Sequence, residues 1–168
     1  MTFQSTVSLK QGFGVAGEFF DGSPHRAEPF ILQSADPGYN VFGRAFTVVS
    51  EGIAQAGGTG VFAGFLVSPK SATSVGTVAG GTLAPTLTLP NNVLAEILNM
   101  GCIIVSLPDA AAIGDLVIYD EVTGELATVI PAGPVPAGFQ LAHAVVDRFT
   151  VDSAGLAVIR VTDVPVTP

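Results

Sequence analysis

The sequence has unusually little charge. Only 12% of its 168 residues are Asp, Glu, Lys or Arg, whereas an ordinary globular domain has about 25%. Hydrophobic residues make up 48% of the chain, so the folded surface must expose many apolar side chains or bare Gly and Pro backbone. Apolar surface of this extent is usually covered by a binding partner. We therefore interpret the protein first as a component of an assembly and only second as an enzyme.

Cysteine and basic residues are also scarce, and each shortage excludes a class of protein. Cys102 is the only cysteine, so no disulfide can form within the chain. One Cys and two distant His cannot build a structural zinc site. The 14 acidic residues outnumber the 6 basic ones and give a net charge of −8. Such a chain cannot neutralise a row of phosphates, so we expect neither nucleic acid nor an anionic membrane as a partner.

Long apolar runs suited to a membrane helix are missing as well. Residues 71–95 carry no charge, but they are full of Gly, Thr, Ser and Pro. Residues 126–146 are also uncharged, and three prolines interrupt them. A membrane-spanning helix needs about 20 mainly apolar residues in sequence. We therefore predict no membrane span.

What the sequence does have is Gly and Pro spread among short runs of Val, Ile, Phe and Thr, a pattern typical of many short strands joined by turns. We predict an all-β fold, either a β-sandwich or jelly-roll-like arrangement or a small barrel. Residues 1–11 are polar and lack Gly and Pro, which predicts an N-terminal arm before a single β domain over 12–168. The expected strands are 26–33, 43–49, 61–67 and 103–107, with hairpins of 116–120 with 125–130 and of 141–151 with 156–162.

One segment, near 91–100, has the pattern of a short helix. Its apolar residues Val93, Leu94, Ile97 and Leu98 would share one helical face. Asn91 suits the N-cap and Gly101 the C-cap of such a helix. We predict at most this one helix, two to three turns long.

Motifs for catalysis are lacking. His25 and His143 are the only histidines, and no Gly-x-Ser-x-Gly elbow accompanies them. Asp120, Glu121 and Glu125 bracket a hairpin turn without the spacing of a calcium loop. We predict no catalytic residue, no cofactor and no metal. A small hydrolase or carbohydrate-binding domain stays an alternative.

The Gly57–Gly60 run has only a superficial likeness to a phosphate-binding loop. It lacks the Gly-Lys-Ser/Thr that would follow, and it leads into a strand rather than a helix. We predict a tight turn between strands, where Gly supplies a positive φ.

Five runs, in this order, resemble the structural cement, or decoration, proteins of tailed bacteriophage heads. The resemblance covers about residues 12–162, and the run at 57–70 is its most specific part. The runs are Asn40–Thr47, Gly57–Lys70, Thr88–Asn91, Ile113–Tyr119 and Thr123–Thr128.

This resemblance implies a β-rich, non-enzymatic protein of the virion. It would be made in the host cytoplasm, bind the major capsid protein on the outer capsid surface, and bridge neighbouring subunits. It would act as a homodimer or homotrimer. Another virion module, from a tail or baseplate, is the nearest alternative.

Partner contacts are expected where apolar residues are exposed. The arm could order on binding, and unpaired edge strands could extend a neighbour's sheet. Ser68 to Leu83 is a long loop without periodicity, a kind of segment that is usually functional or disordered. The candidate contact residues are Phe3, Phe19, Phe20, Lys70 and Val75.

Overall fold

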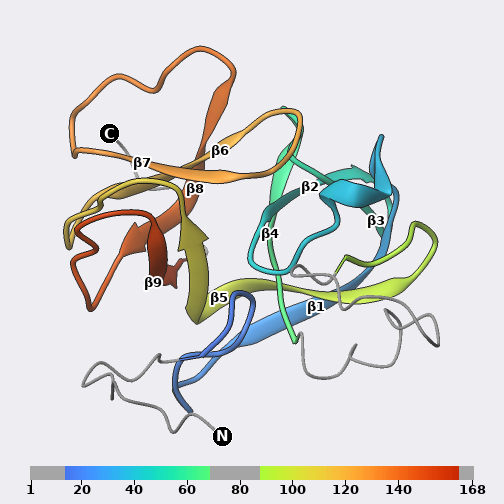
Figure 1. The fold of residues 1–168 in the computed structure, drawn as a ribbon. Helices are drawn as coiled ribbons and strands as arrows, with labels where there is room; N and C mark the ends of the chain where they lie inside the picture. Colours follow the sequence, from blue (N-terminus) through green and yellow to red (C-terminus); the bar gives the residue numbers. More distant parts are fainter. Residues whose placement is uncertain (1–13, 69–87, 163–168) are drawn as a thin grey trace, which may run out of the picture.

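The computed structural model describes residues 14–68 and 88–162. Within these ranges the protein is all-β, as predicted, with nine strands in one continuous sheet, a single 3-10 turn at Pro37–Tyr39 and no α-helix (Figure 1). The strands are β1 (Arg26–Leu32), β2 (Ala45–Ser50), β3 (Ile53–Ala56), β4 (Val61–Leu66), β5 (Leu94–Leu107), β6 (Leu116–Asp120), β7 (Leu126–Val129), β8 (Phe139–Val146) and β9 (Gly155–Val161).

Five of the strands close into a small barrel, one of the predicted architectures. Their order is β1-β3-β2-β4-β5, and β1 pairs back onto β5 to complete the ring (Figure 1). All these pairings are antiparallel except the short parallel contact of β1 with β3. The barrel interior is filled by buried side chains such as Leu32, Phe46, Leu66 and Ile97.

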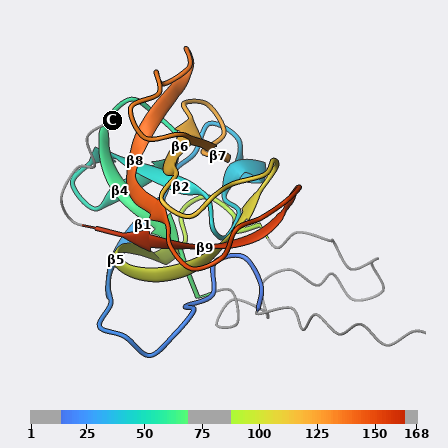
Figure 2. The same ribbon diagram turned by 90° about the vertical axis from the view of Figure 1, so that its left-hand side faces the viewer.

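A second sheet continues from the barrel in the order β5-β9-β8-β6-β7 (Figures 1 and 2). Its inner face and the outside of the barrel enclose a second core. Strand β4 lies between the two cores. Phe62 and Phe65 belong to the second core, whereas Ala63 and Leu66 belong to the barrel interior. From Ala63 to Leu66 the strand is buried on both faces, as its uninterrupted apolar sequence predicts, whereas Val61 at its start is exposed.

Strand β5 is shared by both units. Its first half, Leu94–Met100, pairs with β1, and its second half, Gly101–Leu107, pairs with β9. Gly101 marks the change of partner and has a φ of +131°. A Cβ atom there would lie 2.8 Å from the Cβ of His25. The shared strand therefore requires glycine at this point.

The predicted helix near 91–100 is wrong, because this segment opens strand β5. Along it Leu94 and Glu96 are exposed while Ala95 and Ile97 are buried, which is the period of a strand. Pairing with β1 and β4 decides the structure against the local helical pattern. The expected caps have other roles. Asn91 bonds Ser34 and Asn40, and Gly101 lies inside the strand.

The first hairpin is confirmed as β6 and β7, and the second prediction is confirmed only in part. β8 and β9 do pair, but β8 ends at Val146, five residues before the predicted end. Residues 147–154 form the connection, in which Val151 makes an isolated bridge to Ala111. That bridge draws the end of the predicted strand away from β9.

An N-terminal segment, residues 14–25, lies along β5 (Figures 1 and 2). The Gly17 N–H donates to the Ile104 carbonyl at 2.8 Å, and the Ile104 N–H donates to Glu18 at 2.9 Å. The segment covers a small apolar cluster that includes Cys102. The predicted arm, residues 1–11, lies outside the described residues.

We expect Gly64→Ala to destabilise the protein strongly. Gly64 has a φ of +137°, and a Cβ would lie 2.0 Å from the Leu98 carbonyl oxygen on β5. Backbone strain and overpacking together should lower the free energy of unfolding by about 3 kcal/mol. Gly52→Ala is the control, because Gly52 has a φ of +70° with nothing within 4 Å; it should lose only about 1 kcal/mol. Equal losses in urea unfolding would contradict this account.

Candidate partner-binding surfaces

Three of the sequence runs that carry the resemblance meet at one junction between the barrel and the second sheet. The Gly58 N–H donates to the Glu121 carbonyl at 2.7 Å, and the Gly57 N–H donates to the Ala45 carbonyl at 3.0 Å. The Ala45 N–H in turn donates to the Gly124 carbonyl at 3.0 Å. The β3–β4 turn and the β6–β7 turn are thereby joined by their main chains.

Glycine is required at this junction because the backbones touch. A Cβ on Gly57 would lie 2.7 Å from the Glu121 carbonyl oxygen, and one on Gly124 would lie 2.4 Å from the Ala45 carbonyl oxygen. The Gly57–Gly60 run is thus the tight turn that the sequence predicts. Its glycines allow the barrel and the second sheet to pack closely against each other.

A charged side chain on each half completes the junction. Asp120 accepts hydrogen bonds from the N–H groups of Val122 and Thr123 and from the Thr123 hydroxyl, at 2.7–2.9 Å. Burial acts to raise the pKa of Asp120, but these donors outweigh it and hold the pKa below its ordinary value. Arg44 donates to the Thr123 carbonyl at 3.2 Å and lies 3.7 Å from the Glu125 carboxylate. The acidic turn is therefore a structural turn.

Beside the junction is a groove of about 480 Å³, which we call the seam groove. Its walls are the N-terminal segment, the turn before β2, the end of β5 and the start of β7. Sequence reasoning missed this groove, because only the strand order brings its walls together. The lining residues are Gly14, Val15, Ala16, Val41, Phe42, Gly43, Arg44, Ser106, Pro108, Glu125, Leu126 and Leu156.

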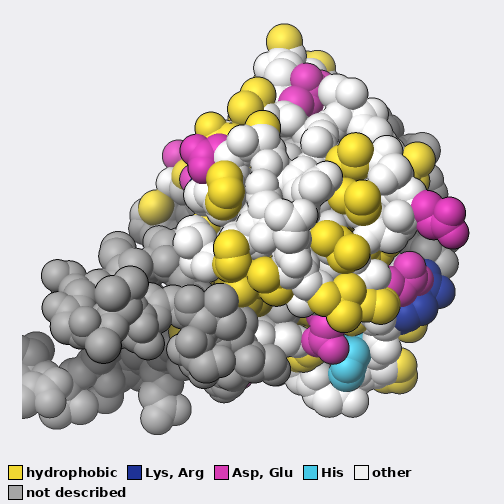
Figure 3. All heavy atoms as spheres, turned by 90° about the vertical axis from the view of Figure 1, so that its right-hand side faces the viewer, with side chains coloured by type: hydrophobic (Ala, Val, Ile, Leu, Met, Phe, Trp, Pro, Cys, Tyr) yellow, Lys and Arg dark blue, Asp and Glu magenta, His cyan; other side chains and the backbone are white. Residues whose placement is uncertain are grey.

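A second candidate surface lies on the outside of the barrel. Ile31 is the cross-strand partner of both Leu94 and Ile53, and we call these three residues the barrel patch. Leu94 is 67% exposed and Ile31 is 41% exposed. Figure 3 shows hydrophobic side chains spread over the face that carries β1 and β3, with charged groups mostly at its margins. Because the sequence has few charged residues, apolar side chains make up much of this exposed face.

The predicted contact residues Phe19 and Phe20 are both partly buried. Phe19 pairs with Ile103 in an isolated bridge. Phe20 packs on the apolar cluster beneath the N-terminal segment, and its ring lies 5.3 Å from the Arg148 guanidinium. Both side chains therefore hold the N-terminal segment in place, and their contact with a partner stays a prediction. Phe3, Lys70 and Val75 lie outside the described residues.

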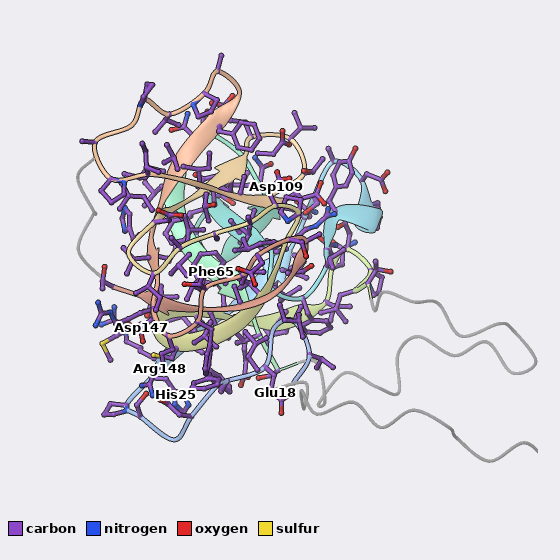
Figure 4. All side chains as sticks on the ribbon, turned by 60° about the vertical axis from the view of Figure 1, so that its left-hand side comes forward. Glu18, His25, Phe65, Asp109, Asp147 and Arg148 are labelled. Atoms are coloured by element: carbon purple, nitrogen blue, oxygen red, sulfur yellow. The ribbon has the colours of Figure 1, made fainter. Side chains whose placement is uncertain are left out.

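Arg148 also holds the N-terminal segment in place, through ion pairs. Its guanidinium bonds Asp21 at 2.9 Å and Asp147 at 3.2 Å. In Figure 4 Asp147 and Arg148 lie next to each other, far from Asp109. The end of the N-terminal segment is thus tied to the β8–β9 connection.

The two histidines sit against aromatic rings. The His25 ring lies 4.3 Å from that of Phe19, and the His143 ring lies 5.1 Å from that of Phe62. In the part of the chain that the structure describes, no group of three or more His, Cys, Asp or Glu is placed to hold a metal ion. No helix within the described ranges is long and apolar enough to cross a bilayer.

Comparison with known proteins decides the family. The model of the structural cement protein family (E217 gp24/Pam3 gp6) matches residues 3–162. The chain belongs to this family. The family predicted from the five sequence runs is thereby confirmed, and the chain is a phage structural cement protein.

Solved structures agree on the fold. A chain from the capsid of Myoviridae phage XM1 superposes with a TM-score of 0.62 at 20% sequence identity. The match covers 96% of this cement protein and 98% of that chain. Comparison with curated proteins finds no match.

We expect Asp120→Asn to weaken the fold in a pH-dependent way. The folded pKa of Asp120 is below its ordinary value of 3.8, so the ionised carboxylate stabilises the protein above that value. This stabilisation is lost as the pH falls through the folded pKa. Asn keeps one acceptor oxygen but no charge, so the variant should be less stable near neutral pH. Urea midpoints should converge below about pH 4; a difference that does not change with pH would contradict the assignment.

Proposed function

We propose that the chain binds the outer surface of an assembled phage head and holds neighbouring major capsid subunits together without any catalytic step. The observation that carries this proposal is the family match over residues 3–162. The apolar, weakly charged exterior supports it, because such a surface is stabilised by contact with other proteins.

Charge favours the outer surface over the inner one. The chain has 14 acidic and 6 basic residues, and packaged DNA would repel a lining of this sign. The same imbalance argues against nucleic acid as the partner. The major capsid protein is the partner that the proposal names.

The barrel patch is the contact that we propose for the capsid. Ile31, Ile53 and Leu94 come from three strands of a closed barrel, so they form a firm apolar surface. Rigid apolar groups that are already exposed lose little conformational entropy on binding. The patch therefore suits a permanent contact with the shell.

Self-association completes the proposal. Most soluble oligomers are closed and symmetric, and a protein that bridges subunits around a capsid axis gains affinity when its copies are joined. We propose a homodimer or a homotrimer.

We expect the purified protein to bind undecorated heads and to raise the temperature at which they rupture and release DNA. Each bound copy adds contacts that must break before the shell opens, and binding stabilises the bound state by mass action. Co-sedimentation and DNA release during heating measure the two effects. Isolated tails serve as the control particle. Binding to tails but not to heads would contradict the capsid assignment and favour a tail or baseplate component.

A pair of variants makes the same experiment test the barrel patch. Leu94→Asp places a charge within the patch, and Ile130→Asp places one at an equally exposed site, since both residues are 67% exposed. Ile130 lies outside the barrel, after β7. Leu94→Asp should reduce head binding at least tenfold and Ile130→Asp should not. Equal binding by two folded variants would remove the barrel patch from the proposal.

A further inference from the structure

The second sheet is almost a closed barrel, and the seam groove is the place where it stays open. Its first strand is β5 and its last is β7. Ser106 of β5 and Leu126 of β7 both line the groove. The first five strands close because β1 pairs with β5, whereas β5 and β7 do not pair with each other. The groove therefore separates two strand edges.

The edge of β5 offers main-chain hydrogen-bonding groups to this groove. Cys102 and Ile104 direct theirs to the N-terminal segment, as shown by the Phe20 and Gly17 N–H groups that donate to their carbonyls at 3.1 and 2.8 Å. Main-chain groups of alternate residues point to the same side of a strand. The N–H and carbonyl of Ser106 therefore point to that side too, beyond the end of the segment. Ser106 is exposed.

The edge of β7 offers the same groups from the opposite side. The Asp120 N–H donates to the Glu125 carbonyl at 2.9 Å, so Glu125 and Ala127 direct their main-chain groups to β6. Leu126 and Thr128 direct theirs away from β6. No strand that the structure describes pairs with β7 on that side. An exposed edge of this kind is a template for an added strand.

The chain itself carries a segment suited to this position. Residues 3–9 partly alternate, with Phe3, Ser5, Val7 and Leu9 on one face of an extended strand and the polar Gln4, Thr6 and Ser8 on the other. They contain neither Gly nor Pro. Apolar side chains line the groove at Val41, Phe42 and Leu156. One face of the segment thus matches the groove, and the other suits solvent.

We propose that residues 3–9 of one copy add as an extended strand to the seam groove of a second copy, where they close the second sheet. The donated strand would form main-chain hydrogen bonds with Ser106 of β5 and with Leu126 and Thr128 of β7, and would bury its apolar side chains. Each copy would give one strand and receive one. In a homodimer this exchange is reciprocal and the contact is isologous, whereas in a homotrimer each copy passes its strand to the next and the heterologous contact closes into a ring.

The strand that fills the seam groove is expected to come from a second copy rather than from the same chain, because of the turn at residues 14–18. Gly14 is part of the groove wall. It is fixed there by the turn in which the Glu18 N–H donates to the Val15 carbonyl at 3.1 Å and Val15 donates to the Glu18 carboxylate at 3.3 Å. The turn thus places Gly14 beside Ile104, whose side chain an added Cβ would meet at 2.5 Å, rather than in line with Ser106. A segment from a second copy is not tied to this turn.

Charge adds to the match. Lys10 follows the segment directly and is one of two lysines in the chain. Glu125 lies at the groove with a side chain that is 61% exposed. Arg44 also lines the groove and lies 3.7 Å from the Glu125 carboxylate, so the groove carries one charge of each sign. Lys10 of a donated strand would add a second partner for Glu125, a contact that high salt would weaken.

The test is a cysteine trap between two distinguishable copies of the full chain. One copy carries Val7→Cys with an affinity tag and the other carries Ser106→Cys, both with Cys102→Ala so that no other thiol reacts. Under mild oxidation we expect a disulfide between the two copies. Ile130→Cys replaces Ser106→Cys in the control, because Ile130 is exposed outside the groove, and its yield should be several-fold lower. Equal yields would overturn the proposal. A double variant whose disulfide forms only within one chain would also overturn it.

A second pair of variants tests the face of the strand. Val7→Asp with Leu9→Asp charges the inward face, and Thr6→Asp with Ser8→Asp charges the outward face equally. The first pair should abolish self-association in sedimentation velocity, and the second should leave it intact. The same effect from both pairs would overturn the proposal. This inference rests on the proposed self-association. Head binding by the Val7→Asp, Leu9→Asp variant tests the capsid role separately, so a failure of the strand exchange can be told from a failure of capsid binding.

Discussion

One strand shared by two sheets is the constraint on which the rest of the structure depends. β5 closes the barrel with its first half and begins the second sheet with its second half. The two cores are therefore joined by continuous backbone as well as by side chains. The junction of the β3–β4 and β6–β7 turns adds main-chain bonds on the far side. The proposed bridging role would require such rigidity, because a hinge between the two halves would transmit no restraint.

The sparse charge of the chain has a structural counterpart in how its surfaces are divided. Arg44, Arg148 and their carboxylate partners hold turns and the N-terminal segment in place. The few charges are thus largely used within the molecule. What is left outside includes the barrel patch and the mouth of the seam groove, both rich in apolar side chains. The low charge content of the sequence therefore corresponds to an apolar exterior, which is the kind of surface that we propose is covered by other proteins.

The sequence allowed much of the fold to be predicted, and its one clear error is instructive. The β6–β7 hairpin followed from its turn residues, and strand β4 followed from an uninterrupted apolar run after a glycine-rich turn. The helix expected near 91–100 failed because the spacing of Val93, Leu94, Ile97 and Leu98 fits one face of a helix, whereas pairing with the distant strands β1 and β4 makes the segment a strand. The seam groove depends on strand order, which a local pattern does not contain. The family followed from the runs that the junction requires, since glycines in backbone contact tolerate no substitute.

The most direct test of the central claim, that this chain braces a phage shell from outside, is a cryo-electron microscopy reconstruction of heads decorated with the purified protein. We expect density on the outer surface that spans the boundary between neighbouring major capsid subunits, with the barrel patch facing the shell. Density confined to the inner surface, or resting on one subunit without crossing a boundary, would contradict it.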